Sequence, residues 1–270
     1  MLFQMIYRQI AIMILLPFFV SGCSSLQTET AISPTPASSP TTPISPTSTI
    51  TPTVIPDQLT PTPDLSDYDF PKSIDPAKQY MFYLHGKIIE DQGIPAIDPV
   101  YGEYEYRAIL QKLSGYGFVV MSEQRAKNTD SVEYARKITE QVKALLDAGV
   151  PAKNITVVGA SKGAGIAIYV SHFLENKEIN FVIMAICNPD EVKYLKQNQI
   201  VLYGNIRSIY DSTDELAGSC QELFSFSEGK GISRYDEVVL NVGTGHGILY
   251  KPMDEWITPL VQWARGQNIK

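Results

Sequence analysis

Short apolar runs alternate with amphipathic segments from about residue 66 to residue 270 of the chain. Six of these runs have the length of a strand and are apolar on both faces: 79–84, 117–122, 155–160, 180–186, 206–210 and 237–242. Strands that are buried on both faces and separated by helical patterns predict a parallel sheet, because crossover helices then cover the sheet on each side. We therefore expect an α/β fold whose mostly parallel sheet has about six strands, with helices on both faces.

The clearest helical pattern covers residues 130–148. Apolar side chains recur along one face of it: Val132, Ala135, Ile138, Val142 and Leu145. Asp130 and Glu133 stand where the two partners of a capping box stand, and Gly149 and Pro151 follow the last turn, where helices commonly end. The segment is therefore predicted to be an amphipathic helix that packs on the sheet.

Residues 1–22 carry a single cation, Arg8, followed by an apolar core over 10–20 and then small residues. This pattern predicts a secretory signal peptide, since the apolar core is too short to span a bilayer comfortably. The run VSGC that ends at Cys23 resembles the lipobox of bacterial lipoproteins. The resemblance implies lipidation of this cysteine and anchoring to a membrane of the cell envelope, outside the cytoplasm. The alternative is a plain signal peptide with an incidental cysteine.

Residues 23–65 are dominated by threonine, proline and serine, and they contain neither lysine nor arginine. A segment of this composition cannot bury enough apolar surface to fold, so it is expected to form an extended, disordered linker. It would act as a stalk between the lipidated cysteine and a globular domain over residues 66–270. That domain is long enough for one hydrophobic core.

The formal net charge of the chain is −7, whereas nucleic-acid binding needs a basic surface, so no nucleic-acid partner is expected. The three histidines are too few and too irregularly spaced for a metal constellation, and no metal is expected. Cys187 and Cys220 could form a disulfide in an oxidising envelope or remain two free thiols, and the sequence leaves both open. Nothing in the sequence indicates the oligomeric state.

A glycine-rich turn follows the third predicted strand, in the sequence ITVVGASKGAG over residues 155–165. The spacing of its glycines resembles the cofactor loop of short-chain dehydrogenases, and that resemblance would imply a dinucleotide pyrophosphate at the helix N-terminus. Three features oppose it. Two strands precede the loop, no later tyrosine is followed four residues on by a lysine, and the next strand ends without an acidic residue. No nicotinamide cofactor is therefore expected.

The same turn contains the pattern Gly159-x-Ser161-x-Gly163 of a nucleophile elbow, which presents a serine hydroxyl between a strand and a helix. Three other segments also follow predicted strands: YLHGK at 83–87, YDSTDE at 210–215 and GTGHG at 243–247. Their order places a His-Gly loop first, then serine, acid and histidine, and it resembles the α/β-hydrolase superfamily. The carboxyl ends of parallel strands share one edge of a sheet, so these loops are expected to converge.

The resemblance implies Ser161 as the nucleophile and His246 as the base that removes its proton. His172 lies inside the helix that follows the serine, and it is interpreted as structural or solvent-facing. His85 precedes the serine and belongs to the His-Gly loop, where the family uses backbone amides. These assignments leave His246, in a glycine-flanked loop after the last strand.

The acid of the triad is less sharply defined. Asp214 is preferred, because the related pattern has a small turn residue directly after the strand, here Asp211, and the acid three positions later. Asp211 remains the alternative acid. A further interpretation makes Ser212 the N-cap of a helix, with Glu215 closing a capping box, and leaves Asp214 to complement the helix dipole.

The oxyanion hole of such an enzyme comes from two backbone N–H groups, and the resemblance assigns these to Lys162 and Lys87. The residues expected to shape the surrounding loops are His85, Gly86, Gly159, Gly163 and Asp211. The side chains of the two lysines, together with Arg125, form either an electropositive rim for an anionic substrate or ordinary solvated surface charge.

These features together predict an extracytoplasmic, lipid-anchored serine hydrolase that cleaves an ester or related acyl bond in a small-molecule or cell-envelope substrate. Only about twenty residues separate the fourth and fifth strands, so no large lid is expected. A shallow site of this kind favours exposed or tethered substrates over a buried lipid chain. A catalytically silent binding module of the same fold, displayed on the stalk, is the alternative function.

Overall fold

The computed structural model describes residues 64–267 of the chain. The predicted signal peptide, the lipidation site at Cys23 and nearly all of the predicted linker lie outside the described residues. The short 3-10 helix η1 (Leu65–Tyr68) comes first, capped by the Asp64 side chain. It is attached to the domain, because the Tyr68 carbonyl oxygen accepts the N–H of Ser122 at 2.8 Å. No helix within the described part of the chain is long and apolar enough to cross a membrane.

Six strands form one sheet in which every neighbouring pair is parallel, with the order β4-β1-β5-β6-β7-β8. The strands are β1 (Tyr80–Leu84), β4 (Val119–Met121), β5 (Ile155–Ala160), β6 (Asn180–Met184), β7 (Gly204–Asp211) and β8 (Ile232–Leu240). All six predicted strands are present. β8 begins at Ile232 rather than at residue 237, because an edge strand alternates between apolar and polar residues and its first half lacks an apolar run.

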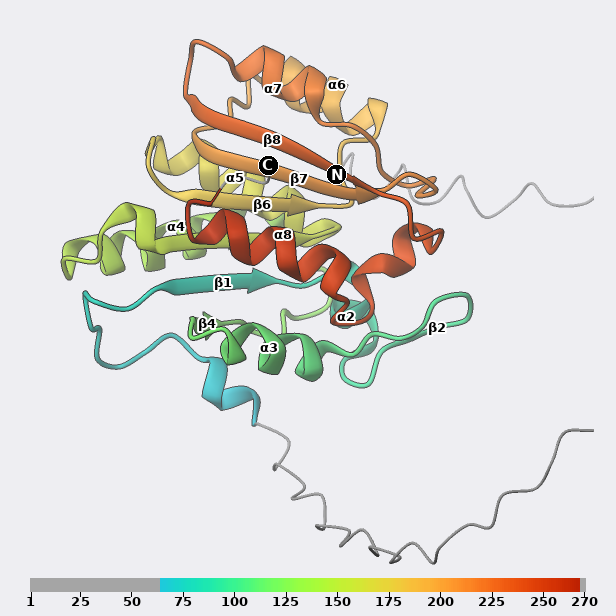
Figure 1. The fold of residues 1–270 in the computed structure, drawn as a ribbon, viewed down its shortest axis with the longest axis horizontal. Helices are drawn as coiled ribbons and strands as arrows, with labels where there is room; N and C mark the ends of the chain where they lie inside the picture. Colours follow the sequence, from blue (N-terminus) through green and yellow to red (C-terminus); the bar gives the residue numbers. More distant parts are fainter. Residues whose placement is uncertain (1–63, 268–270) are drawn as a thin grey trace, which may run out of the picture. The chain divides into compact units, whose positions relative to one another are not determined.

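Helices cover both faces of this sheet, as Figure 1 shows. They are α2 (Lys87–Gln92), α3 (Tyr106–Gly115), α4 (Ser131–Asp147), α5 (Lys162–Leu174), α6 (Pro189–Gln197), α7 (Gln221–Ser227) and α8 (Asp254–Ala264), with the 3-10 helices η2 (Ala152–Asn154) and η3 (Gly245–Leu249). On one face, residues of α4, α5, α6 and α7 belong to one hydrophobic cluster with strand residues such as Tyr80 and Phe82. On the other, residues of α3 and α8 belong to a second cluster with Met81 and Tyr83, in which α3 packs on β4 and α8 on β6, β7 and β8. The α/β fold predicted from the sequence is thus confirmed.

The predicted helix over residues 130–148 is α4, flanked at its ends by Asp130 and Ala148. The Asp130 carboxylate accepts the N–H groups of Val132 and Glu133, at 2.9 and 3.0 Å. These bonds satisfy N–H groups that have no partner inside the helix. α4 packs along α5, so it supports the helix that begins at the candidate nucleophile.

A small antiparallel hairpin that the sequence does not predict lies between α2 and α3. Its strands, β2 (Ile97–Asp98) and β3 (Gly102–Glu103), have two residues each. Strands this short have no readable period. The hairpin lies beyond the carboxyl end of β1 (Figure 1). Its turn carries Tyr101, which packs against Gly247 in η3.

Candidate active site

Ser161 lies at the sharp turn between β5 and α5. Its φ of 52° is in the left-handed region, where a residue other than glycine is held only by the surrounding structure. The Ser161 N–H donates to the carbonyl oxygen of Met184 in β6, at 2.9 Å, which fastens the turn to the sheet. This is the backbone conformation of a nucleophile elbow, with the hydroxyl projecting from the end of a central strand.

Gly163 allows the first turn of α5 to lie against the end of β1. A Cβ atom at this position would lie 1.9 Å from the carbonyl oxygen of Leu84. Gly159 is similarly constrained, because its Cβ would lie 2.2 Å from the carbonyl oxygen of Gly163. Both contacts are with backbone atoms, which have no rotamer to move to. The two glycines of the motif therefore set how closely strand and helix approach next to the serine.

Gly163→Ala is expected to destabilise the fold by about 3 kcal/mol or more, because the added methyl group overlaps the backbone of β1. Gly165→Ala, in the same helix, is the matched control, since the described residues place no other heavy atom within 4 Å of its Cβ beyond the helix backbone. Gly165→Ala is expected to increase the free energy of unfolding by up to about 1 kcal/mol, because alanine is the better helix former. Thermal unfolding measures both changes, and equal melting temperatures would contradict the close approach.

Three side chains from separate loops meet in one hydrogen-bonded chain. Nε2 of His246 is 3.0 Å from Oγ of Ser161, and Nδ1 of His246 is 2.8 Å from Oδ2 of Asp214. The Asp214 carboxylate is fully buried, and its other oxygen accepts the N–H of Leu216 at 2.9 Å. A carboxylate only accepts hydrogen bonds, so Nδ1 carries the proton and Nε2 accepts the serine hydroxyl. This tautomer is the one that can take a proton from Ser161.

Asp211 holds the loop that carries Asp214. Its Oδ1 accepts the N–H and the hydroxyl of Thr213, at 2.9 and 2.6 Å, and its Oδ2 accepts the N–H groups of Val242 and Gly243, at 2.9 and 3.0 Å. Burial works to raise the pKa of the Asp211 carboxyl, but these hydrogen bonds outweigh it and lower the pKa below its ordinary value. Asp211 therefore ties the loop after β7 to the loop after β8, while Asp214 faces the imidazole.

The interpretation of Ser212 as a helix N-cap is wrong, because residues 212–220 form no helix and α7 begins at Gln221. The segment has neighbouring anchors instead. Cys187 and Cys220 are joined by a disulfide, with their Cα atoms 5.2 Å apart. The N–H of Gly218 also donates to the chain after β6, at the carbonyl oxygen of Ile186. The acid loop is thus fixed at both its ends.

Lys87 and Lys162 are the first residues of α2 and α5. N–H groups in the first turn of a helix have no partner within the helix, and the helix dipole is positive there. Gly86, which caps α2, lies beside the serine, since a Cβ atom added to it would be 3.8 Å from Cβ of Ser161. The structure therefore brings the His-Gly loop next to the elbow, as an oxyanion hole shared by the two segments requires.

The interpretation of Arg125 as a rim charge or a solvated surface charge is wrong. Its side chain is fully buried, and the guanidinium donates to the carboxylate of Glu90 and to the carbonyl oxygen of His85. The sequence hides this, because Arg125 follows β4 in the polar stretch SEQRAKNT, which has the composition of an exposed loop. The Lys162 side chain also turns inward to Glu90, so that of the three cations only Lys87 has a substantially exposed side chain.

His85 is buried and uses both nitrogens of its ring. Nε2 accepts the N–H of Arg125 at 3.0 Å, so Nδ1 carries the proton and donates to the carbonyl oxygen of Gly86 at 2.8 Å. Burial, helped by the neighbouring Arg125 cation, lowers the pKa of His85 to about 3. The imidazole is therefore neutral at physiological pH and shapes the His-Gly loop. His172 lies within hydrogen-bond distance of the backbone of Val201, in a structural position.

His246 lies in the 3-10 helix η3 rather than in an irregular loop. The next residue, Gly247, packs on Tyr101 of the hairpin, since a Cβ atom added to it would be 2.7 Å from Cδ1 of the tyrosine ring. Sequence reasoning misses Tyr101, because nothing in a short polar segment before the elbow indicates that it folds back onto a loop near the other end of the domain.

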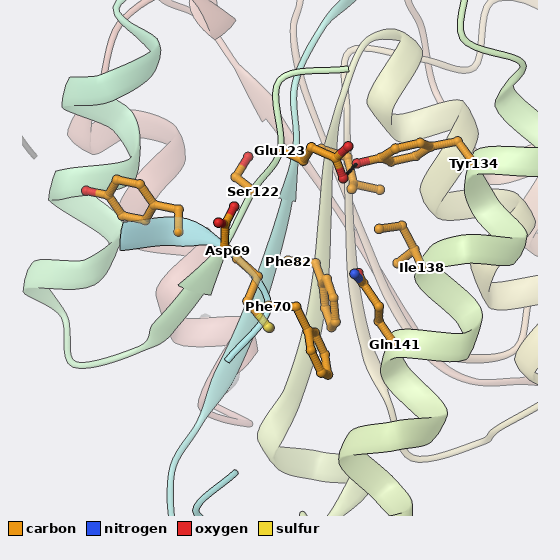
Figure 2. Close-up of a pocket in the computed structure, with 11 residues that line it drawn as sticks. Asp69, Phe70, Phe82, Ser122, Glu123, Tyr134, Ile138 and Gln141 are labelled. Carbon is orange, nitrogen blue, oxygen red and sulfur yellow. Dashed lines mark hydrogen bonds between the residues drawn. The ribbon is translucent and has the colours of Figure 1, made fainter. Parts of the chain in front are cut away.

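A hollow of about 380 Å³ lies beside the loops of the triad; chain neighbours of Asp214 and His246 line it, whereas the three triad residues themselves do not. Its lining mixes apolar, hydroxyl and carboxylate groups: Tyr101, Thr213, Glu215, Leu216, Gly243, Thr244 and Gly245. A volume of this size suits a small-molecule site. The cavity in Figure 2, of about 40 Å³, lies between α4 and residues such as Phe70 and Ser122, and no triad residue lines it. It is too small for an ester substrate, so the candidate site is the one at the strand ends.

Comparison with known proteins finds no matching family model and no similar curated protein. Among solved structures, SOBER1 of Arabidopsis thaliana is 10% identical over 70% of this chain and 99% of its own, with a TM-score of 0.48. An esterase/lipase from an uncultured bacterium is 13% identical over 73% of this chain and 78% of its own, with a TM-score of 0.46. A lipase-esterase related protein of Clostridium acetobutylicum is 11% identical over 72% and 97%, with a TM-score of 0.39. These likenesses are weak, so the functional argument rests on the chain's own geometry.

Proposed function

We propose that this chain is a serine hydrolase that cleaves an ester or related acyl bond, with Ser161, His246 and Asp214 as its catalytic triad. The observation that carries the proposal is the hydrogen-bonded chain from the serine hydroxyl, through both ring nitrogens of the histidine, to the buried carboxylate. A serine hydroxyl is a poor nucleophile until a base removes its proton. Here the base is within reach of the hydroxyl, and an acid holds the base in the required tautomer.

In the first half of the proposed reaction, Oγ of Ser161 attacks the acyl carbon while Nε2 of His246 takes the hydroxyl proton. Asp214 stabilises the imidazolium that results. The carbonyl oxygen becomes an oxyanion that the N–H groups of Lys162 and Lys87 would stabilise, commonly by about 3 kcal/mol for one donor. The imidazolium then protonates the leaving alcohol or amine, and the acyl group remains on the serine. In the second half, His246 takes a proton from a water molecule, and the water oxygen bonds to the acyl carbon. The bond between that carbon and Oγ of Ser161 then breaks, the imidazolium returns its proton to Oγ, and the acid is released.

We further propose that the hydrolase acts outside the cytoplasm, anchored through a lipidated Cys23. The VSGC motif and the Thr/Pro/Ser-rich composition of residues 23–65 support this placement. Its substrate would then be a small-molecule or cell-envelope ester within reach of the linker. Mass spectrometry of the mature N-terminus tests the anchor: an acylated Cys23 is expected, and an unmodified residue other than Cys23 would refute it.

Turnover of p-nitrophenyl esters, from acetate to decanoate, tests the function with the full-length protein. Acetate and butyrate are expected to match or exceed decanoate in kcat/KM. Between β6 and β7 the chain has only the short helix α6, so no large lid covers the site there. A longer acyl chain would stay exposed to water and gain little of the roughly 0.8 kcal/mol per CH₂ that burial supplies. A steep rise of kcat/KM with chain length would contradict the shallow site. No turnover of any ester would favour the silent binding module.

A further inference from the structure

A buried cluster of charges joins three segments of the chain close to the elbow. Glu90 of α2 accepts a hydrogen bond from Nε of Arg125 at 2.6 Å through Oε1, and one from Nζ of Lys162 at 2.5 Å through Oε2. The Lys162 ammonium also donates to the carbonyl oxygen of Thr129, at 2.7 Å. The side chains of Glu90 and Arg125 are fully buried, and that of Lys162 is 14% exposed.

Burying this cluster costs free energy, so it contributes little to the net stability of the fold. Two cations face one carboxylate, and Nη1 of Arg125 is buried without a hydrogen-bond partner in the described part of the chain. Removing charges from water costs several kcal/mol per ion, and apolar side chains of similar volume often stabilise as well or better. Stability alone is therefore a poor reason for the cluster, and its position indicates another one.

The cluster reaches both of the residues whose N–H groups are the proposed oxyanion donors. Glu90 lies in the first turn of α2, the helix that begins at Lys87. Lys162 begins α5, and its side chain ties that helix N-terminus to Glu90. Arg125 comes from the loop after β4. Its Nη2 donates to the carbonyl oxygen of His85, two residues before α2 begins, and so links Glu90 to the His-Gly loop.

We propose that Glu90 is a positioning residue for the oxyanion hole. Its carboxylate, through Lys162, holds the N-termini of α2 and α5 at a fixed separation, so that the N–H groups of Lys87 and Lys162 are directed at one point. The inference rests on the proposed function, because it requires an oxyanion formed from an acyl substrate.

Glu90→Gln is expected to lower kcat for p-nitrophenyl acetate by about 10- to 100-fold while KM changes by less than about threefold, because the donors act mainly on the transition state. Asp91→Asn is the matched control. It lies on the same helix and removes a carboxylate from the half-exposed Lys87 ammonium, so it is expected to keep kcat within about twofold.

Turnover by the wild-type protein distinguishes failure of the proposed function from failure of the positioning role. If the wild type shows no turnover that Ser161→Ala abolishes, the proposed function itself is wrong. If it shows such turnover and Glu90→Gln has the wild-type kcat at a matched melting temperature, the function stands and the positioning role is overturned.

A second readout separates the placement of the donors from a general loosening of the site. In a Ser161→Cys background, alkylation by iodoacetamide depends on the introduced thiolate and forms no oxyanion. Adding Glu90→Gln is expected to leave the alkylation rate within about twofold, measured by mass spectrometry of the peptide that contains position 161. If alkylation slows as much as kcat falls, Glu90 supports the whole site and the specific role is overturned.

If Glu90→Gln fails to fold, because two buried cations lose their carboxylate, Lys162→Met decides the question. This variant keeps the backbone N–H at position 162 and most of the aliphatic stem, and it removes the ammonium with its hydrogen bonds to Glu90 and to the carbonyl oxygen of Thr129. A loss of kcat of about 10-fold, with partial recovery in Lys162→Arg, supports the proposal. The wild-type kcat in Lys162→Met overturns it.

Discussion

Ser161→Ala is expected to lower the turnover of p-nitrophenyl acetate by about 10⁴- to 10⁶-fold, to the level that an oxyanion hole and substrate binding supply without a nucleophile. The loss is large because no other hydroxyl is placed to replace the one 3.0 Å from the His246 imidazole in the described structure. Initial rates of the full-length variant and wild type measure it. Melting temperatures of the two proteins should agree closely, because the removed hydroxyl group is small.

Ser212→Ala is the control for that experiment. Ser212 is an exposed residue of the acid loop, and its hydroxyl donates to the Asn241 side chain rather than to the triad. Its replacement is expected to leave turnover within about twofold of wild type, as surface substitutions usually change little. If Ser161→Ala retains a tenth or more of the wild-type rate, Ser161 is not the nucleophile and the elbow serves another purpose.

Asp214→Asn is expected to keep the fold and to cut turnover by up to about 10⁴-fold. The amide cannot stabilise the imidazolium, and its NH₂ group favours the tautomer of His246 in which Nε2 is protonated and unable to take the serine proton. Asp211→Asn is expected to lose less turnover than Asp214→Asn but more stability. It should lower stability by about 1 to 3 kcal/mol, because an amide cannot accept all four hydrogen bonds that Asp211 receives.

Initial rates and thermal unfolding of the two aspartate variants, both assayed below their melting temperatures, check this ranking. If Asp211→Asn loses more turnover than Asp214→Asn while both are folded, Asp211 is the acid and the observed contact to His246 is not the catalytic one. Equal and small losses in both would mean that the charge behind the imidazole comes from elsewhere.

Much of the fold can be predicted from the sequence, because hydrophobic burial on two faces leaves a readable pattern. β5 is buried at all six positions, and the predicted strand 155–160 has the same bounds. β8 is an edge strand whose alternating, half-exposed first part has no such pattern, and this is why its start is missed. The parallel topology then brings the site together, because the carboxyl ends of parallel strands lie at one edge of the sheet. The loops that carry Ser161, Asp214 and His246 follow these ends.

The choice between Asp211 and Asp214 depends on side-chain direction, which spacing does not determine. Asp211 ends β7 and Asp214 follows three residues later, and only the structure shows which carboxylate reaches the imidazole. The contact between Arg125 and Glu90 is even harder to predict from the sequence. Their ion pair joins residues 35 positions apart through the packing of α2 on the loop after β4, and neither residue belongs to a motif. Contacts of this kind leave no local signal in a single sequence.

The site of covalent labelling by a fluorophosphonate tests the central claim most directly, because this probe reacts with a serine only where a base and an oxyanion hole activate it. The full-length wild-type protein is expected to take up one label, on the peptide that contains Ser161, and Ser161→Ala is expected to take up none. Labelling that persists in Ser161→Ala, or that lies on another residue, would contradict the account.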